Sequence, residues 1–193
     1  MPEACVIYWG PKEAERWIAK AVKAERMMDE PNKLIRAQLD PRRTLTPEEM
    51  QRVLDHMAKA PFSLRSVSVD RSIRGRVFQS RILGDKEPSI IAHLAKRVLV
   101  EQDWADDVTP VEYLDHLRSV IDDPALRKAV YLSKDKRLFV GLLAPNRIPE
   151  ARLGKNHSAL LWVVYSADYG TIVTGYQVRG IEEITLPKDA RWL

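Results

Sequence analysis

Two apolar runs in the carboxyl-terminal half of the chain are separated by a short polar turn. Residues 158–166 and 171–178 are rich in β-branched and aromatic side chains, and Ala167-Asp168-Tyr169-Gly170 lies between them. A turn that carries Asp and Gly between two such runs predicts a β-hairpin. Both alternating sets of positions in the first run are apolar, so we expect this strand to be central and covered on both faces.

The second strand of this hairpin carries hydroxyl groups on one face. Alternation places Thr174 and Tyr176 on the same side of the strand, where they project next to each other. Two hydroxyls on the same face of a strand can form the polar surface of a binding site. Thr and Tyr are also good strand formers, so strand propensity alone accounts for the pattern as well, and both interpretations stay open.

Helical periodicity dominates the amino-terminal part. Apolar positions predict a helix from Pro11 to Glu30, with Pro31 ending it. A second helix is expected from Thr46 to about Pro61, because Thr46-Pro47-Glu48-Glu49 has the form of a capping box. We interpret residues 1–61 as a helical accessory region.

The remaining residues alternate between helical and extended patterns. Short strands are expected at 64–69 and 73–83, and longer ones at 136–144 and 181–186. Helices are expected at 88–102, from the second capping box at 109–112, and at 123–131. The pattern predicts an α+β fold, with N-terminal helices followed by a small antiparallel sheet packed against helices. Residues 62–193 would form the α+β domain.

Composition limits the class of protein. The chain has 193 residues, of which 45% are hydrophobic and 30% charged, as in a globular protein. No apolar run approaches the roughly 18 residues that span a bilayer, so no membrane partner is expected. The single cysteine, Cys5, excludes an intramolecular disulfide and a multi-cysteine metal site. A reducing cytoplasm is the expected compartment.

Charge is unevenly distributed along the chain. Residues 61–100 carry a net charge of +5, residues 101–135 carry −5, and residues 136–193 carry +3. Basic blocks on both sides of an acidic one could form a groove for a polyanion, or could be solvated faces that never meet. The arginines at 65–81 could also pair with the acidic block downstream of them. The candidates for RNA contacts are Arg74, Arg76, Lys96, Arg147, Arg152, Lys155 and His157.

Several kinds of active site are missing from the sequence. It contains no Walker A loop, GxGxxG, HExxH or GxSxG motif. Its four histidines do not have the spacing of metal ligands. We therefore expect neither a metal site nor a cofactor.

One histidine stands out by its neighbours. His93 lies three and four residues before Lys96 and Arg97, so the three can share a helix face. Two adjacent cations lower the pKa of an imidazole, which suits a neutral general base. A histidine on a helix surface without function is the alternative. Metal-free RNA cleavage needs a base, an acid and cations that stabilise the phosphorane.

The order of these segments resembles a known family. A helix with H-L-A-K-R at 93–97, Trp104, a T-P-x-E-Y-L helix at 109–114, and strands ending in Y-G-T-I-V-T-G-Y at 169–176 follow one another. This order resembles the metal-independent toxin ribonucleases of the Barnase–EndoU–colicin E5/D–RelE-like superfamily, particularly its phage-borne branch. Members of that branch often close with a strand I-x-T-x-Y followed by Pro, and Gln177 replaces that proline here. The resemblance covers about residues 77–186.

This resemblance implies a function and a set of site residues. The expected activity is that of a metal-independent endoribonuclease, a toxin or phage effector, that cleaves RNA by 2′-hydroxyl attack to a 2′,3′-cyclic phosphate. Carried over by position, the catalytic candidates are His93, Arg97, Thr174 and Tyr176. RNA and a neutralising immunity or antitoxin protein would be the partners.

Two other classes of protein remain open. The chain could be a non-catalytic nucleic-acid-binding or phage accessory protein, or a structural interaction domain with its arginines in salt bridges. Convergence of the four catalytic candidates within one cleft would favour the enzyme, and their scattering on separate faces would favour the other two.

Overall fold

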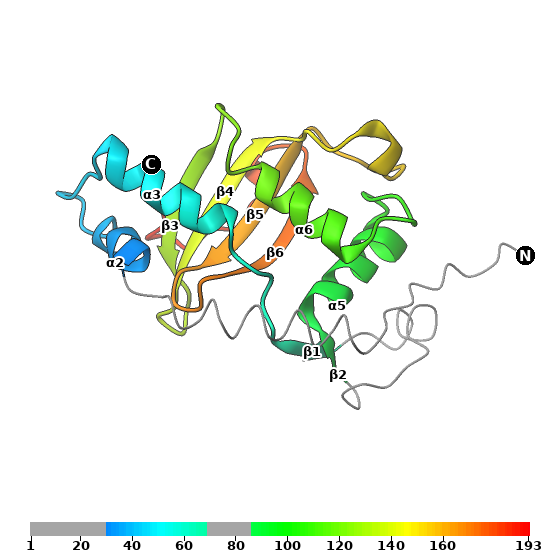
Figure 1. Cartoon of the computed structure of the whole chain (residues 1–193), viewed down its shortest axis with the longest axis horizontal. Coiled ribbons are helices and arrows are strands. Elements are labelled where there is room, and N and C mark those ends of the chain that lie inside the picture. The colour runs from blue at the N-terminus through cyan, green and yellow to red at the C-terminus, as the bar shows by residue number, and fades with distance from the viewer. Residues whose placement is uncertain (1–29, 69–85) are drawn as a thin grey trace, which may run out of the picture.

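A five-stranded antiparallel sheet forms the centre of the molecule (Figure 1). The computed structural model describes residues 30–68 and 86–193. The strand order is β6-β5-β4-β3-β7, so β3 to β6 form a meander and β7 joins it beside β3. The strands are β3 Arg127–Leu132, β4 Leu138–Pro145, β5 Leu160–Ser166, β6 Thr171–Val178 and β7 Arg191–Trp192. The expected α+β class is confirmed.

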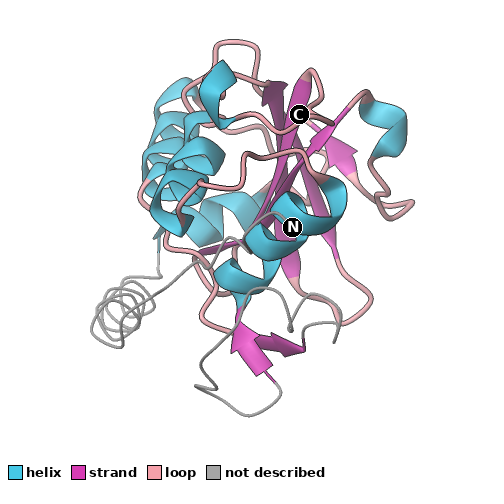
Figure 2. Ribbon diagram, turned by 90° about the vertical axis from the view of Figure 1, so that its right-hand side faces the viewer, coloured by secondary structure: helices cyan, strands magenta, loops and turns pink. Residues whose placement is uncertain are grey.

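The helices of the described residues lie mostly on one side of this sheet (Figure 2). A two-stranded antiparallel sheet of β1, Ser66–Ser68, and β2, Lys86–Pro88, lies apart from the main one. None of the described helices is long and apolar enough to cross a membrane. The helices are α2 Glu30–Ala37, α3 Pro47–Ala58, α5 Ser89–Lys96, α6 Pro110–Ser119, the π-helical η1 Arg97–Glu101, and the 3-10 segments η2 Glu150–Arg152 and η3 Ile181–Glu183.

Both capping boxes are confirmed. The Thr46 side chain accepts a hydrogen bond from the backbone N–H of Glu49, and the Glu49 carboxylate accepts one from the backbone N–H of Thr46. Thr109 and Glu112 make the same two contacts at the start of α6. Each box satisfies two backbone donors that a helix start otherwise leaves without partners.

The two faces of the sheet are covered by different parts of the chain. One face carries the larger core, in which Val53 and Met57 of α3 and Leu114 of α6 pack with sheet residues such as Val163. The other face carries a smaller cluster around Trp162, closed by the carboxyl-terminal segment. Because α2 and α3 share the larger core with the sheet, the described residues have no separate core before residue 61.

The hairpin of β5 and β6 has the predicted form. β5 lies between β4 and β6, and its residues are buried on both faces. Gly170 in the turn has a positive φ of 63°, which a residue without Cβ adopts without strain. The pairing register shifts between Val164 and Tyr165, which pair with Thr174 and Ile172. Val173 is therefore an extra residue on β6, and the strand pair has a β-bulge there.

Three local predictions were wrong. Residues 123–131 were expected to be helical, but Asp123 forms a turn in which its Oδ1 accepts from the N–H of Ala125, and β3 begins at Arg127. The strand expected at 181–186 is a 3-10 turn that directs Ile184 onto the smaller cluster. Pro31 does not end a helix, because it lies in the first turn of α2, where a missing N–H costs little.

Some predictions concern residues outside those described. These are the helix at 11–29, the strand at 73–83, Cys5, and the RNA-binding candidates Arg74 and Arg76.

Candidate functional site

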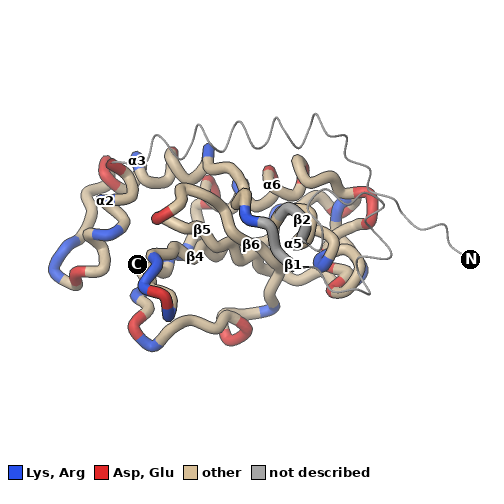
Figure 3. Tube along the Cα trace, turned by 90° about the horizontal axis from the view of Figure 1, so that it is seen from below, with Lys and Arg blue, Asp and Glu red and all other residues tan. Residues whose placement is uncertain are grey.

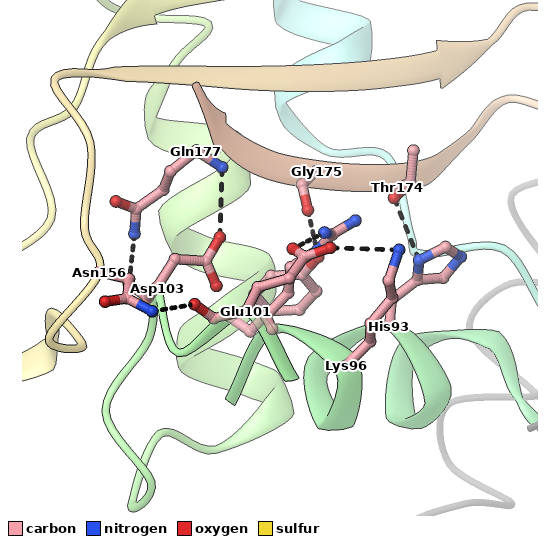
Figure 4. A network of polar contacts seen from close by, with 10 residues as sticks. His93, Lys96, Glu101, Asp103, Asn156, Thr174, Gly175 and Gln177 are labelled. Atoms are coloured by element: carbon pink, nitrogen blue, oxygen red, sulfur yellow. Dashed lines mark hydrogen bonds and ion pairs between the residues drawn. The ribbon is translucent and has the colours of Figure 1, made fainter. Parts of the chain in front are cut away.

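Helix α5 and the π-helical turn η1 that follows it contact the edge strand β6 through two side-chain pairs. The imidazole Nδ1 of His93 lies 3.1 Å from the hydroxyl oxygen of Thr174. The guanidinium carbon of Arg97 lies 4.9 Å from the centre of the Tyr176 ring. Figure 4 shows the first of these pairs, with His93 reaching from the helix toward Thr174 on the strand. All four catalytic candidates from the sequence therefore meet at one place.

The spacing of the two elements explains why both pairs form. His93 and Arg97 are four residues apart, or ~6 Å along a helix axis. Thr174 and Tyr176 are two residues apart, or ~7 Å along a strand. A helix and a strand that run side by side can thus make both contacts in register.

Phe62 and the backbone that follows it hold α5 against the strand. Phe62 forms a bridge with Ile172, and its ring centre lies 5.8 Å from that of His93. The N–H of Ser89, the first residue of α5, donates to the carbonyl of Arg65 at 2.9 Å. The segment before β1 therefore ties the start of α5 to the start of β6.

Gly175 allows α6 to approach the same strand. A Cβ at this position would collide with the Leu117 side chain of α6. The Tyr113 hydroxyl, also on α6, donates to the Gly175 carbonyl at 2.8 Å. Close approach of α6 fixes the strand between the two residues whose side chains contact α5.

Burial keeps His93 neutral. Together with the charges of Arg97 and Lys96, burial lowers the pKa of His93 to about 4, while Glu101 acts in the opposite direction. At neutral pH the ring therefore has an unprotonated nitrogen. The tautomer decides whether the Thr174 hydroxyl donates to Nδ1 or accepts from it.

The predicted cations of the site already have a carboxylate partner. Glu101 forms an ion pair with Arg97, and its other oxygen lies 3.1 Å from the Lys96 ammonium. Arg97 and Glu101 lie in the π-helical turn η1, which ends at Gln102 in the left-handed region with φ 58°. Within the described part of the chain, Nε of the buried Arg97 has no hydrogen-bond partner.

A second acid of the site is buried. Burial raises the pKa of Asp103 to about 6, against the lowering effect of the Arg97 charge. One carboxylate oxygen of Asp103 has no hydrogen-bond partner among the described residues. Asp103 is thus a carboxyl group that is partly protonated near pH 6.

Gln177 joins three segments behind the site. Its side-chain amide donates to the Asp103 carbonyl at 2.6 Å, and its backbone N–H lies 3.5 Å from the Asp103 carboxylate. Its side-chain oxygen accepts from Asn146 and from the N–H of Ser158. A proline at position 177 could make none of these donor contacts, so Gln177 has a structural role here.

The loop of RNA-binding candidates packs beside η1, and its arginines are paired. The Asn156 side chain donates to the Glu101 carbonyl at 3.0 Å (Figure 4), and the N–H of Gly154 donates to the Asp103 carbonyl at 3.1 Å. Arg147 contacts Asp123 at 3.0 Å, and Arg152 contacts Asp107 at 2.6 Å and Glu112 at 3.1 Å. These acids, Asp107, Glu112 and Asp123, belong to the acidic block at 101–135. Figure 3 shows basic and acidic segments alternating along the trace.

Two further candidates of this loop are exposed. His157 lies with Nδ1 3.0 Å from the Gly154 carbonyl, and Lys155 points to solvent. The loop therefore exposes Lys155 and His157 to solvent, and neither makes a contact with His93, Arg97, Thr174 or Tyr176 among those described.

Sequence reasoning missed Glu101, Asp103, Tyr113 and Gln177. The spacing of four residues between Arg97 and Glu101 was a usable signal for an ion pair on a helix. Asp103 and Gln177 are 74 residues apart in the chain, and nothing local in the sequence indicates that they meet.

No group of three or more His, Cys, Asp or Glu side chains within residues 30–68 and 86–193 could hold a metal ion. Comparison with protein-family models, with curated proteins and with solved structures found no match to this chain.

Proposed function

We propose that this protein is a metal-independent endoribonuclease whose active site is the α5–β6 edge. The observation that carries the proposal is the pair of contacts in register, His93 with Thr174 and Arg97 with Tyr176. A titratable base, two hydroxyls and a guanidinium come together from segments about 80 residues apart.

In the proposed reaction His93 accepts the proton of the ribose 2′-hydroxyl, which attacks the adjacent phosphorus. The P–O5′ bond breaks, and the Tyr176 hydroxyl donates its proton to the leaving 5′-oxygen. Burial raises the pKa of Tyr176, so this hydroxyl is protonated at neutral pH. The products are a 2′,3′-cyclic phosphate and a 5′-hydroxyl end, and solvent restores both protonation states.

Arg97 and Thr174 have supporting roles in this proposal. The guanidinium stabilises the additional negative charge of the phosphorane, with its ion pair to Glu101 fixing its position. The Thr174 hydroxyl orients the His93 ring, so that one nitrogen faces the substrate.

The wider setting is proposed on the resemblance alone. A toxin or phage effector of this kind acts on RNA in the cytoplasm, and a neutralising immunity or antitoxin protein would cover the site in the producing cell.

The test uses the full chain and RNA in excess chelator. We expect internal cleavage with 2′,3′-cyclic phosphate ends, detected by end-group analysis. His93→Ala should slow cleavage by on the order of 100-fold, the usual contribution of a general base. His56→Ala is the matched control, because it removes a partly buried histidine of α3 that lies outside the site.

Two results would contradict the proposal. One is cleavage at the wild-type rate by His93→Ala, which would place the activity elsewhere. The other is RNA binding by the wild type without cleavage of any RNA tested, which would favour the non-catalytic binding protein.

A further inference from the structure

Two arginines from distant segments lie over one tyrosine at the β5–β6 turn. The guanidinium carbon of Arg65 is 4.5 Å from the centre of the Tyr169 ring, and that of Arg137 is 5.6 Å from it. Stacking on an aromatic ring holds a guanidinium by its face and leaves its in-plane N–H groups available as donors. The cluster of Arg65, Arg137 and Tyr169 is here called the Tyr169 cluster.

The two arginines of this cluster differ from the others in their partners. Neither forms an ion pair with a carboxylate of a described residue, whereas Arg147 and Arg152 both do. The nearest acid in the sequence, Asp168, is already engaged. Its carboxylate accepts from the Arg36 guanidinium at 2.7 Å and from the N–H of Leu138 at 2.9 Å.

The neighbouring turn adds positive charge. The β3–β4 turn lies at the same end of the sheet as the β5–β6 turn (Figure 1), joined by the bond from the N–H of Ala167 to the carbonyl of Leu138. It carries Lys134 and Lys136, both exposed, with Asp135 between them. The surface around Tyr169 is therefore cationic.

This surface is continuous with the α5–β6 edge. The Arg65 carbonyl accepts from the N–H of Ser89, and His93 follows one helical turn later. On the strand side, Tyr169 precedes β6, and Thr174 is five residues further, at most ~17 Å along an extended chain. A polynucleotide that places one phosphate at His93 can reach the Tyr169 cluster with another.

We propose that Arg65 and Arg137, held by Tyr169, form a subsite for a backbone phosphate of single-stranded RNA. This inference rests on the proposed function, because RNA is named as the polyanion only as the substrate of the neighbouring site. A guanidinium binds phosphate well, because two of its in-plane N–H groups can donate in parallel to two phosphate oxygens. The subsite carries no base specificity.

The test separates binding from cleavage. The probe is a fluorescein-labelled 12-nucleotide RNA with 2′-O-methyl groups throughout, which lacks the attacking hydroxyl and stays intact. Affinity for the full chain is measured by fluorescence anisotropy over a salt series. Arg65→Ala and Arg137→Ala should each weaken binding by about tenfold at low salt. Each should also lower the salt slope by about 0.7, the value for one phosphate contact on a single strand.

Arg127→Ala is the matched control. Arg127 is exposed and lies 4.9 Å from the centre of the Trp192 ring, so the variant loses the same charge and the same kind of contact elsewhere. Its affinity should change less than about twofold, since a distant surface charge is screened. Melting temperatures of all variants should stay near that of the wild type.

The outcomes for subsite and activity are distinct. Equal weakening by all three variants, or unchanged affinity in Arg65→Ala and Arg137→Ala, would overturn the subsite even if the wild type cleaves RNA. Selective loss of binding in those two variants supports the subsite even if natural RNA stays uncleaved, which would contradict only the nuclease proposal.

Discussion

The β5–β6 end of the sheet and the loop at 145–157 carry similar basic residues in different surroundings. Arg65 and Arg137 lie over Tyr169 and have no carboxylate partner among the described residues. Arg147 and Arg152 contact the acids of residues 101–135. From charge alone the loop was one of the candidates for RNA contacts, yet its arginines already form ion pairs with neighbouring carboxylates.

This difference shows that the binding of a polyanion depends more on what each arginine already contacts than on how many basic residues a region has. A guanidinium whose N–H groups are taken by carboxylates has few donors left for phosphate. Arg97 is paired with Glu101, but its Nε has no hydrogen-bond partner among the described residues. A guanidinium on an aromatic ring keeps its donors available. The region beside His93 is therefore where we expect a polyanion to bind and react.

The largest expected difference between the two regions is in the rate of RNA cleavage. Tyr176→Phe removes the proposed acid at the α5–β6 edge and should slow cleavage by on the order of 100-fold. His157→Ala, in the loop, should change the rate by less than about twofold, the effect of a small change in exposed charge. Single-turnover assays at saturating protein measure both. Equal effects in the two regions would remove the distinction.

Stability should separate two glycines of these regions. A Cβ at Gly154, in the loop, would collide with the backbone of Gln102 and Trp104, which cannot move aside. A Cβ at Gly175, on β6, would collide with the end of the Leu117 side chain, which can rotate. Gly154→Ala should lower the free energy of unfolding by about 3 kcal/mol or more, and Gly175→Ala by about 1–2 kcal/mol. Urea unfolding measures both, and the reverse order would contradict the packing described.

The α5–β6 edge should also give stability an unusual pH dependence. The pKa of His93 falls to about 4 on folding, so the unfolded chain binds an extra proton between about pH 4 and 6.5, and stability falls as pH falls. The pKa of Asp103 rises to about 6, so the folded chain binds the extra proton there, and this group opposes the loss.

Asp103→Asn should therefore lose stability more steeply than the wild type when pH falls from 6.5 to 4. His93→Ala should lose less than the wild type over the same interval. Urea midpoints at several pH values provide the measurement. Parallel curves for the wild type and both variants would show that neither group titrates as described.

The smallest effect is expected in the loop. Arg152→Ala removes contacts to Asp107 and Glu112 that are partly exposed to solvent. Such pairs contribute about 0–1 kcal/mol, so stability should change little. Affinity for the 2′-O-methyl RNA should not fall. A tenfold loss of affinity would instead show that this arginine leaves its acids to bind phosphate.

The sequence predicted those parts of the fold that depend on nearby residues. The capping boxes at Thr46 and Thr109 and the turn at Gly170 are set by contacts within a few positions, and all three were correct. The helix predicted after Asp123 was wrong because an aspartate can begin either a helix or a short turn. Here Asp123 forms a turn, and pairing with β4 makes the following residues a strand.

Contacts between distant segments were not predictable in the same way. Val53 and Met57 of α3 pack with the sheet in the larger core, and no local pattern in the sequence indicates this contact. The meeting of His93 with Thr174 was anticipated through a resemblance, since no local pattern links them. Glu101 and Asp103 were missed because their effect depends on burial and on Arg97.

The contact between His93 and Thr174 is tested most directly by a double-mutant cycle. Single-turnover cleavage of one defined RNA in excess chelator is measured for the wild type, His93→Ala, Thr174→Val and the double variant. If Thr174 acts by orienting His93, the double variant should be no slower than His93→Ala alone, because residues that act as a unit are not additive. Independent, additive losses, or wild-type rates in both single variants, would contradict the account.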